Sequence, residues 1–256
     1  MALAGIAENN MDKLIHHNSS LNGQTVKWWP TDSEEQYQLN INTQRSQLEK
    51  YHWIDADISY VNNSHGFRTS EFDQQTNFIT VGCSYTYGIG LPINSIWPEL
   101  LSKQLELPVF NLGVPGASLD TIYRIIKHYV PLLKPKHVIL LAPDPSRMEI
   151  FINNQPYIHL PSSTDYYGFM QSEWVKQWLT SDENTIVHTQ KNIEAMAYIC
   201  KKNAVNFYVY TTEFFLNLYA VSKGGLARDL MHPGRLYHQK FSKHVYQDIV
   251  NNCTYE

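Results

Sequence analysis

The sequence has few cysteines and no long hydrophobic run. Its 256 residues include three cysteines, Cys83, Cys200 and Cys253. These are too few for a disulfide framework and lack the Cys-x-x-Cys spacing of a zinc site. The longest buried-looking apolar stretch, residues 138–142, has the length of a strand, whereas a membrane span needs about 18 apolar residues. We therefore expect reduced thiols, no metal and no transmembrane segment.

The sequence also lacks a large excess of charge of either sign. The chain has 20 Lys and Arg against 24 Asp and Glu, without a basic block. Nucleic acids and anionic membranes bind concentrated basic residues, so neither is expected as a partner. Residues 1–7 are small and apolar, but the basic leader of a secretory signal is missing. This pattern predicts a cytoplasmic protein.

The composition is globular, with 43% hydrophobic residues. At roughly 150 residues per domain, the chain is too short for two full domains. Residues 1–72 are polar and amide-rich, and they predict an N-terminal extension that contains a helix from Ser33 onward. This extension is also the candidate surface for self-association or attachment to a larger assembly. The compact domain is expected at 73–256, with an aromatic-rich insertion at about 143–184.

Strand-like and helix-like segments alternate along the compact domain. The last predicted helix, for example, has apolar residues at steps of four, which share one helix face. Alternation of this kind predicts a parallel sheet with helices on both faces. The stretch 143–184 is read as irregular. The predicted strands are 78–81, 109–112, 137–141 and 205–210, and the predicted helices are 95–105, a helix capped by Ser118, 186–202 and one after Pro233.

Three segments at predicted element boundaries carry small or reactive residues. Residues 82–88 (GCSYTYG) follow the first strand and lift Ser84 off its end. Residues 111–116 (NLGVPG) follow the second strand, and their glycines allow a backbone N–H to approach a ligand closely. Residues 229–234 (DLMHPG) precede the last helix. Because function sits at the carboxyl ends of parallel strands, we expect these segments to meet there.

Ser84, His232 and Asp229 can form a nucleophilic triad. A serine hydroxyl needs a base to remove its proton, and the base needs a third group that fixes its tautomer and stabilises its cation. A spacing of three places Asp229 and His232 on the same side of a turn. Backbone N–H groups at Ser84 and Gly113 could then hold a developing oxyanion.

These segments resemble the SGNH (GDSL-type) hydrolase family. The resemblance rests on Gly-x-Ser-x-Thr-x-Gly, Asn-x-Gly-x-x-Gly and Asp-x-x-His-Pro-Gly in the right order, and it covers roughly residues 75–252. It implies a flavodoxin-like, three-layer α/β/α sandwich and ester hydrolysis through an acyl-enzyme, without metal or cofactor. By position, Ser84 matches the family nucleophile, Gly113 the second oxyanion donor, Asp229 the acid and His232 the base.

Cys83 is the first departure from the family pattern. The family usually has an aspartate there, which helps to brace the turn around the nucleophile. Strand alternation points the Cys83 side chain away from Ser84. We interpret Cys83 as a small buried filler, with a nucleophilic role as the alternative.

Asp144 is the second departure. It stands where the family carries the asparagine that donates to the oxyanion, and an ionised carboxylate there would repel this charge. Pro143 and Pro145 beside it lack N–H groups. Loss of one such donor lowers the rate by about 10² to 10³. The site is then slow, recruits Asn153 or Asn154, or has lost hydrolysis, and the sequence leaves these three readings open.

Aromatic residues of the 143–184 stretch follow a strand end and would overhang the predicted site. Tyr166, Tyr167 and Trp174 are candidates for stacking on a sugar or lining an acyl pocket. Packing of the insertion onto the domain is the alternative.

Two functions follow from the sequence. The first is a serine esterase or deacylase acting on a small ester, with an O-acetyl group on a carbohydrate as the candidate. The second is a catalytically impaired module of a larger assembly, with residues 1–72 as its attachment arm. Arg147 and Arg228 are candidates for orienting an anionic substrate group, or they are surface residues.

Overall fold

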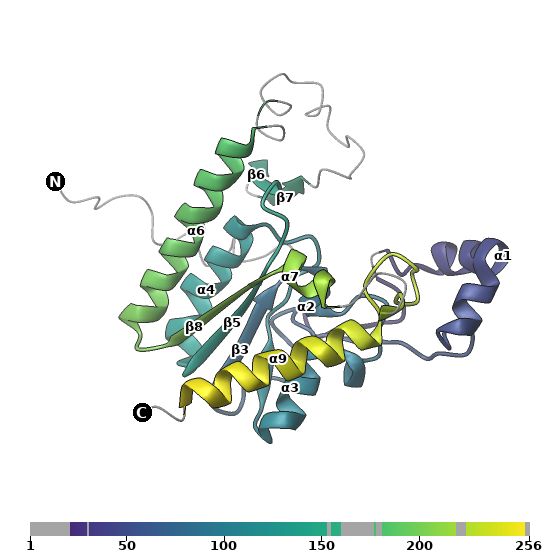
Figure 1. Ribbon diagram of the computed structural model, residues 1–256, viewed down its shortest axis with the longest axis horizontal. Helices are drawn as coiled ribbons and strands as arrows, with labels where there is room; N and C mark the ends of the chain where they lie inside the picture. The colour runs from purple at the N-terminus through teal and green to yellow at the C-terminus, as the bar shows by residue number, and fades with distance from the viewer. Residues whose placement is uncertain are drawn as a thin grey trace.

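The centre of the molecule is a parallel sheet of four strands (Figure 1). The computed structural model describes residues 21–29, 31–152, 155–159, 177, 181–218 and 224–253. The sheet order is β4-β3-β5-β8, in which the strands come second, first, third and fourth along the chain. This is the beginning of the flavodoxin-like order 2-1-3-4-5. The strands are β3 (Phe78–Gly82), β4 (Val109–Asn111), β5 (His137–Ala142) and β8 (Asn206–Thr211).

Helices cover both faces of this sheet. Successive strand residues point to opposite faces, and in β3 the side chains of Ile79 and Val81 enter one core cluster while that of Phe78 enters another. Each apolar face needs a helix layer to bury it. The result is the three-layer α/β/α arrangement that was predicted. One layer holds α4 (Leu119–Leu133) and α6 (Asp182–Lys202), and the other holds α3 (Trp97–Leu105) and α9 (Arg235–Cys253).

The predicted helix signals are confirmed. Ser118 caps α4, since its hydroxyl accepts from the Thr121 N–H and the Thr121 hydroxyl accepts from the Ser118 N–H. The apolar face of α9 is buried against the sheet, as its four-residue spacing predicts. The four residues of this face are Tyr237, Phe241, Val245 and Ile249.

The interpretation of 143–184 as irregular is wrong for its first part. Strands β6 (Met148–Ile152) and β7 (Gln155–His159) form an antiparallel hairpin. The missed signal is the Asn-Asn pair between two β-prone runs, because asparagine tolerates the left-handed conformations of tight hairpin turns. The hairpin is fixed to α4 by the ion pair between Arg124 and Glu149. Tyr166, Tyr167 and Trp174 lie outside the described residues.

The N-terminal residues share a core with the compact domain. Strands β1 (Thr25–Val26) and β2 (Tyr60–Val61) pair with each other, and α1 (Glu34–Lys50) begins after its predicted cap, Ser33. The side chains of Leu48 and Trp53 pack in one cluster with that of Tyr87. The division of the chain at residue 72 stays a prediction, but residues on both sides of it are buried together.

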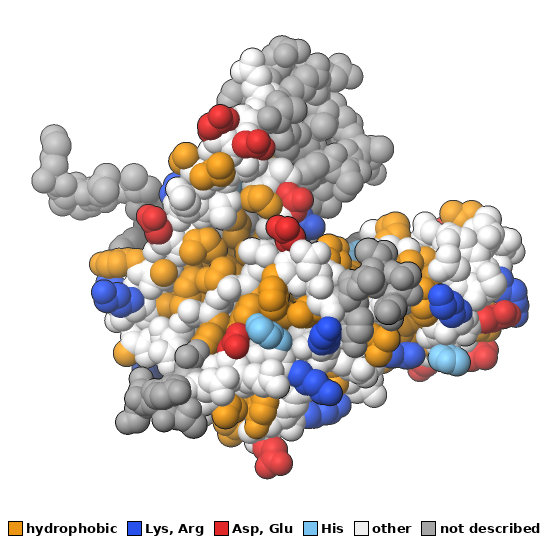
Figure 2. Space-filling view, in the orientation of Figure 1, with side chains coloured by type: hydrophobic (Ala, Val, Ile, Leu, Met, Phe, Trp, Pro, Cys, Tyr) orange, Lys and Arg blue, Asp and Glu red, His pale blue; other side chains and the backbone are white. Residues whose placement is uncertain are grey.

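Three short helices complete the fold of the described residues, and β8 lies at an edge of the sheet. Among the described strands, β8 pairs only with β5. Val209 of β8 is 41% exposed, and Figure 2 shows hydrophobic side chains gathered over this edge between α6 and α9.

No helix in the described ranges is long and apolar enough to cross a membrane. The short helices are α2 (Ser84–Tyr87), η3 (Ile93–Ser95) and α7 (Thr212–Asn217).

Candidate active site

The turn from β3 into α2 presents Ser84 at the carboxyl end of the sheet. Ser84 is the first residue of α2. A Cβ at Gly82 would lie 2.2 Å from the Thr86 hydroxyl oxygen and 2.8 Å from the Leu141 carbonyl oxygen, so only glycine fits this sharp turn. The turn sits where the chain order of the strands reverses, which is where ligands bind in sheets of this type. Ser84 is 8% exposed, and its hydroxyl makes no hydrogen bond with the residues that the structure describes.

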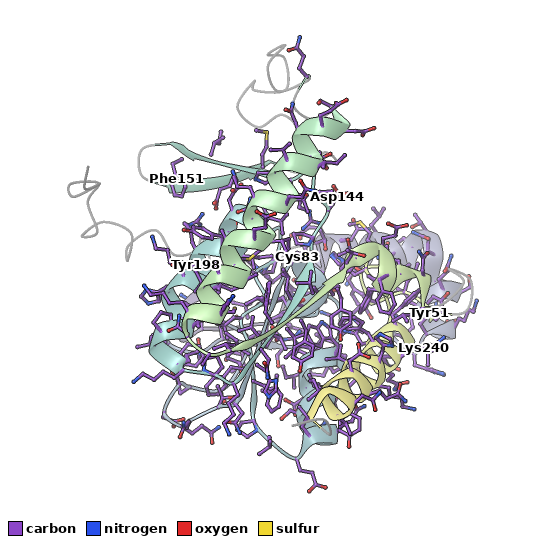
Figure 3. The ribbon with its side chains drawn as sticks, turned by 60° about the vertical axis from the view of Figure 1, so that its left-hand side comes forward. Tyr51, Cys83, Asp144, Phe151, Tyr198 and Lys240 are labelled. Carbon is purple, nitrogen blue, oxygen red and sulfur yellow. The ribbon has the colours of Figure 1, made fainter. Side chains whose placement is uncertain are left out.

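Cys83 points into the core, as predicted. It is fully buried in the cluster formed by the sheet and α4 (Figure 3). The thiol has no exposed surface. This removes Cys83 as an alternative nucleophile.

The acid and base of the predicted triad lie in a closed loop before α9. Leu226 and Pro233 form a β-bridge at its base, and the Ala227 N–H donates to the His232 carbonyl at 2.8 Å. This closure brings the Asp229 carboxylate to 2.5 Å from Nδ1 of His232. The second carboxylate oxygen accepts the N–H groups of Met231 and His232, each at 3.0 Å. The predicted spacing of three therefore gives the expected contact.

The environment keeps Asp229 ionised. Burial raises the pKa of its carboxyl group, but the hydrogen bond and charge of His232, together with the N–H groups of His232 and Met231, outweigh burial and lower the pKa to about 2. A carboxylate in this position accepts the Nδ1 proton of His232. Nε2 is then left as the basic nitrogen.

We expect acid to remove part of the stability of the fold through Asp229. Its folded pKa lies below the ordinary value of 3.8, so the stabilisation is fully present above about pH 4 and is lost as the pH falls toward 2. The whole effect is about 2 to 3 kcal/mol. Urea unfolding between pH 6 and pH 2.5 measures it.

The variant Asp229→Asn provides the reference for this measurement, and Asp57→Asn, at an exposed position, is the matched control. The advantage of the wild type over Asp229→Asn should shrink as the pH falls, whereas Asp57→Asn should follow the wild type throughout. An advantage that stays constant over this range would contradict the lowered pKa.

The imidazole of His232 lies beside the serine turn. Its ring meets that of Tyr85 edge-on, with centroids 5.7 Å apart, and Tyr85 directly follows Ser84. The loop is held in this place by the Arg228 N–H, which donates to the Gly90 carbonyl at 3.1 Å. The Ser84 hydroxyl makes no hydrogen bond to His232, but a catalytic hydrogen bond between a nucleophile and its base is often long before substrate binds and tightens afterwards. The structure thus brings the Asp229–His232 pair and the turn that carries Ser84 to one place.

Gly113 allows a close approach to α2, but its N–H is already engaged. A Cβ at Gly113 would lie 2.6 Å from the Tyr87 nitrogen. The Asn111 amide accepts the Gly113 N–H at 2.9 Å and donates to the Thr86 carbonyl at 2.9 Å, which ties this loop to α2. The oxyanion role of Gly113 stays a prediction, and its N–H is not free in the unliganded site.

Gly116 has the open N–H of this loop. It adopts a φ of 79°, and nothing lies within 4 Å of an added Cβ. Its N–H makes no hydrogen bond within the described part of the chain. Gly116 is the second glycine of the Asn-x-Gly-x-x-Gly motif.

Asp144 is committed to its own turn. Its carboxylate accepts the Ser146 N–H at 2.9 Å and the Ser146 hydroxyl at 2.5 Å. The side chain is exposed, and Figure 3 places it beyond the end of the sheet, toward the β6–β7 hairpin. A carboxylate has no proton to donate to an oxyanion, so the third donor of the family pattern is missing here. Asn153 and Asn154 lie outside the described residues.

The two candidate arginines have different surroundings. Arg228 is 2% exposed and pairs with Asp32, so it is not a surface residue and does not face a substrate. Arg147 is half-buried and donates to the Ala117 carbonyl at 3.2 Å. It has no carboxylate partner among the described residues. A positive charge therefore lies in the loop next to Gly116.

The described residues contain no metal-ligand cluster, and one cavity lies away from Ser84. No three His, Cys, Asp or Glu side chains among them are grouped as metal ligands. A cavity of about 420 Å³ lies beside β4, and its lining includes Arg68, Ile96 and Val109 but neither Ser84 nor His232. This cavity is separate from the triad residues.

Solved structures similar to this chain include lipolytic proteins and esterases. One assigned to the G-D-S-L family, from Desulfitobacterium hafniense, has a TM-score of 0.46 and 15% identity over 68% of this chain and 99% of the other. A G-D-S-L family member from Veillonella parvula has a TM-score of 0.35 and 15% identity over 66% and 96%. A catalytic mutant of an acetylxylan esterase from Geobacillus stearothermophilus has a TM-score of 0.39 and 12% identity over 68% and 94%. No family model and no curated protein matches the sequence.

Proposed function

We propose that this chain is a serine ester hydrolase with Ser84 as nucleophile, His232 as general base and Asp229 as the orienting acid. The observation that carries the proposal is the contact of 2.5 Å between Asp229 and Nδ1 of His232, in a loop whose imidazole packs against the residue next to Ser84. This arrangement leaves Nε2 of His232 as the basic nitrogen beside the serine turn.

The reaction has two halves. Nε2 of His232 takes the Ser84 proton while the serine oxygen attacks the ester carbonyl carbon, and His232 then returns the proton to the departing alcohol. An acyl group stays on Ser84. Water attacks this acyl-enzyme with His232 again as base, which releases the carboxylic acid and restores the serine.

The oxyanion is held by the N–H groups of Ser84 and Gly116, with the charge of Arg147 close by. Support for Gly116 comes from its N–H, which makes no hydrogen bond among the described residues, and from the open space at its α-carbon. Support for Arg147 comes from its charge, which acts on Tyr85 directly after Ser84, and from its contact with the Ala117 carbonyl. A fixed positive charge near a developing oxyanion lowers the barrier. Arg147 thus takes over part of the role of the missing asparagine amide.

The proposed substrate is a small ester, with an O-acetyl group on a carbohydrate as the candidate. The support is the aromatic content of the stretch after β5, where Tyr166, Tyr167 and Trp174 are proposed to contact the sugar. Tyr85 and Phe215, whose rings are 5.6 Å apart, are proposed to form the wall beside the serine turn.

A fluorophosphonate probe tests the nucleophile directly. The wild type should be labelled, the modified peptide should contain Ser84, and an aryl acetate should be hydrolysed. His232→Ala should lose both labelling and hydrolysis, because the hydroxyl then has no base. Cys83→Ser serves as the control for the neighbouring nucleophile and should be labelled at Ser84. A wild type that is neither labelled nor active would overturn the enzyme proposal and favour a non-catalytic module of a larger assembly.

A further inference from the structure

We infer that Thr31 and Asp32 position the acid of the proposed triad, so that the active site is built from both ends of the chain. Thr31 pairs with Asp229, and Asp32 pairs with Arg228. We call these four residues the clasp. The inference rests on the proposed function for its catalytic consequence, and on hydrogen bonds alone for its geometry.

The Thr31 hydroxyl completes the hydrogen bonding of the Asp229 carboxylate. It donates to Oδ2 at 2.7 Å, the same oxygen that lies 2.5 Å from Nδ1 of His232. The other oxygen, Oδ1, accepts the N–H groups of Met231 and His232. Two donors on each oxygen fix the plane of the carboxylate. The acceptor for His232 is thereby held in one direction.

The ion pair between Asp32 and Arg228 holds Thr31 and Asp229 in their positions. Arg228 donates to Asp32 through Nε at 2.9 Å and Nη2 at 2.7 Å. Both side chains are at most 2% exposed, and the Tyr60 hydroxyl also donates to Asp32 at 2.6 Å. A buried, two-pronged ion pair tolerates little displacement. Thr31 and Asp32 are neighbours in the chain, and so are Arg228 and Asp229. Thr31 therefore cannot shift along the loop without breaking the ion pair between Asp32 and Arg228.

Two further contacts hold the backbone of the same loop. The Asn40 amide donates to the Asp229 carbonyl at 3.1 Å, and the Trp53 indole donates to the Leu226 carbonyl at 2.8 Å. Both side chains are almost fully buried. The segment that contains α1 therefore grips both the carboxylate and the backbone of the acid–base loop.

Loss of the Thr31 hydroxyl should act through His232 and not on substrate binding. Without it, Oδ2 keeps only the His232 contact and the carboxylate gains freedom to turn. The free energy of a hydrogen bond to a charged group corresponds to a change of about 10- to 100-fold in rate. We expect Thr31→Val to lower kcat by that factor while KM stays unchanged, since the Thr31 hydroxyl is used by the carboxylate of Asp229.

The closing experiment compares Thr31→Val with Thr31→Ser in the full chain. Valine keeps the shape of threonine without the hydroxyl, and serine keeps the hydroxyl. The readouts are kcat and KM for an aryl acetate, and the low-field proton NMR signal of the His232 Nδ1–H, assigned by its loss in His232→Gln. Thr43→Val, which removes an exposed hydroxyl of α1, is the matched control.

Thr31→Val should lose kcat and move the NMR signal, Thr31→Ser should restore most of both, and Thr43→Val should change neither. If the wild type is active and Thr31→Val matches it in kcat and in the signal, the positioning role is overturned while the hydrolase proposal stands. If the wild type is inactive but its signal moves in Thr31→Val alone, the clasp is supported and the hydrolase proposal fails. A wild type without the signal contradicts the clasp.

Discussion

Asp229→Asn should lower kcat for ester hydrolysis by about 10⁴-fold. The two N–H groups at Oδ1 require an acceptor, so the amide oxygen of asparagine takes that side. The amide nitrogen then faces Nδ1 of His232 and the Thr31 hydroxyl. A donor at this position forces the proton of the imidazole onto Nε2, and a protonated Nε2 cannot accept the proton of Ser84.

Steady-state kinetics with an aryl acetate measure this loss. KM should change little, because the substitution leaves the surroundings of Ser84 intact. Ser84→Ala should be at least as impaired, since removal of the serine or histidine of a triad costs about as much as removal of all three members, and removal of the acid costs less. Asp57→Asn is the control for an exposed carboxylate that makes no contact with His232 in the described structure. Full activity in Asp229→Asn would sink the proposed tautomer and the triad with it.

Arg228→Met should lower the free energy of unfolding by about 3 to 5 kcal/mol. Asp32 is fully buried, and its carboxylate would keep only the hydrogen bond from Tyr60. A buried charge without its partner destabilises the fold far more than the pair stabilises it. The arginine also stacks on Trp28, with its guanidinium carbon 4.3 Å from the ring centroid, so some packing is lost as well.

Urea denaturation of three variants separates charge from packing. The double variant Asp32→Leu, Arg228→Met has no unpaired charge and should recover most of the lost stability. Arg45→Met removes the exposed partner of Glu49 on α1 and should change the free energy of unfolding by less than about 1 kcal/mol. A loss in Arg228→Met no larger than that in Arg45→Met would show that the buried pair has no special role.

The sequence predicted the elements whose signals are local. The strand that ends at Gly82 and the helix capped by Ser118 depend on neighbouring residues, and both occur as expected. The Asp229–His232 contact was also accessible, because a spacing of three within one turn settles it. The β6–β7 hairpin was missed although its signal was local, because the whole stretch 143–184 was interpreted as irregular.

The contacts that complete the site could not be derived in this way. Thr31 and Asp229 are separated by 198 positions, and no periodicity or motif links a threonine in an amide-rich stretch to a carboxylate near the other end. The engagement of the Gly113 N–H by Asn111 likewise depends on a side-chain direction that the motif alone does not contain. Such long-range side-chain pairing is determined by the folded structure as a whole.

The pairing of Asp32 with Arg228 has a consequence for the order of assembly during translation. A ribosome makes Asp32 long before Arg228, which follows 196 positions later, and domains fold as their chain emerges. Until the later residue is out, the carboxylate of Asp32 has no guanidinium partner, and α1, which follows Asp32, has no acid–base loop to contact. The acid–base loop therefore reaches its final form only after residues 226–233 have been made, so a nascent chain that carries Ser84 without this loop lacks the proposed acid and base.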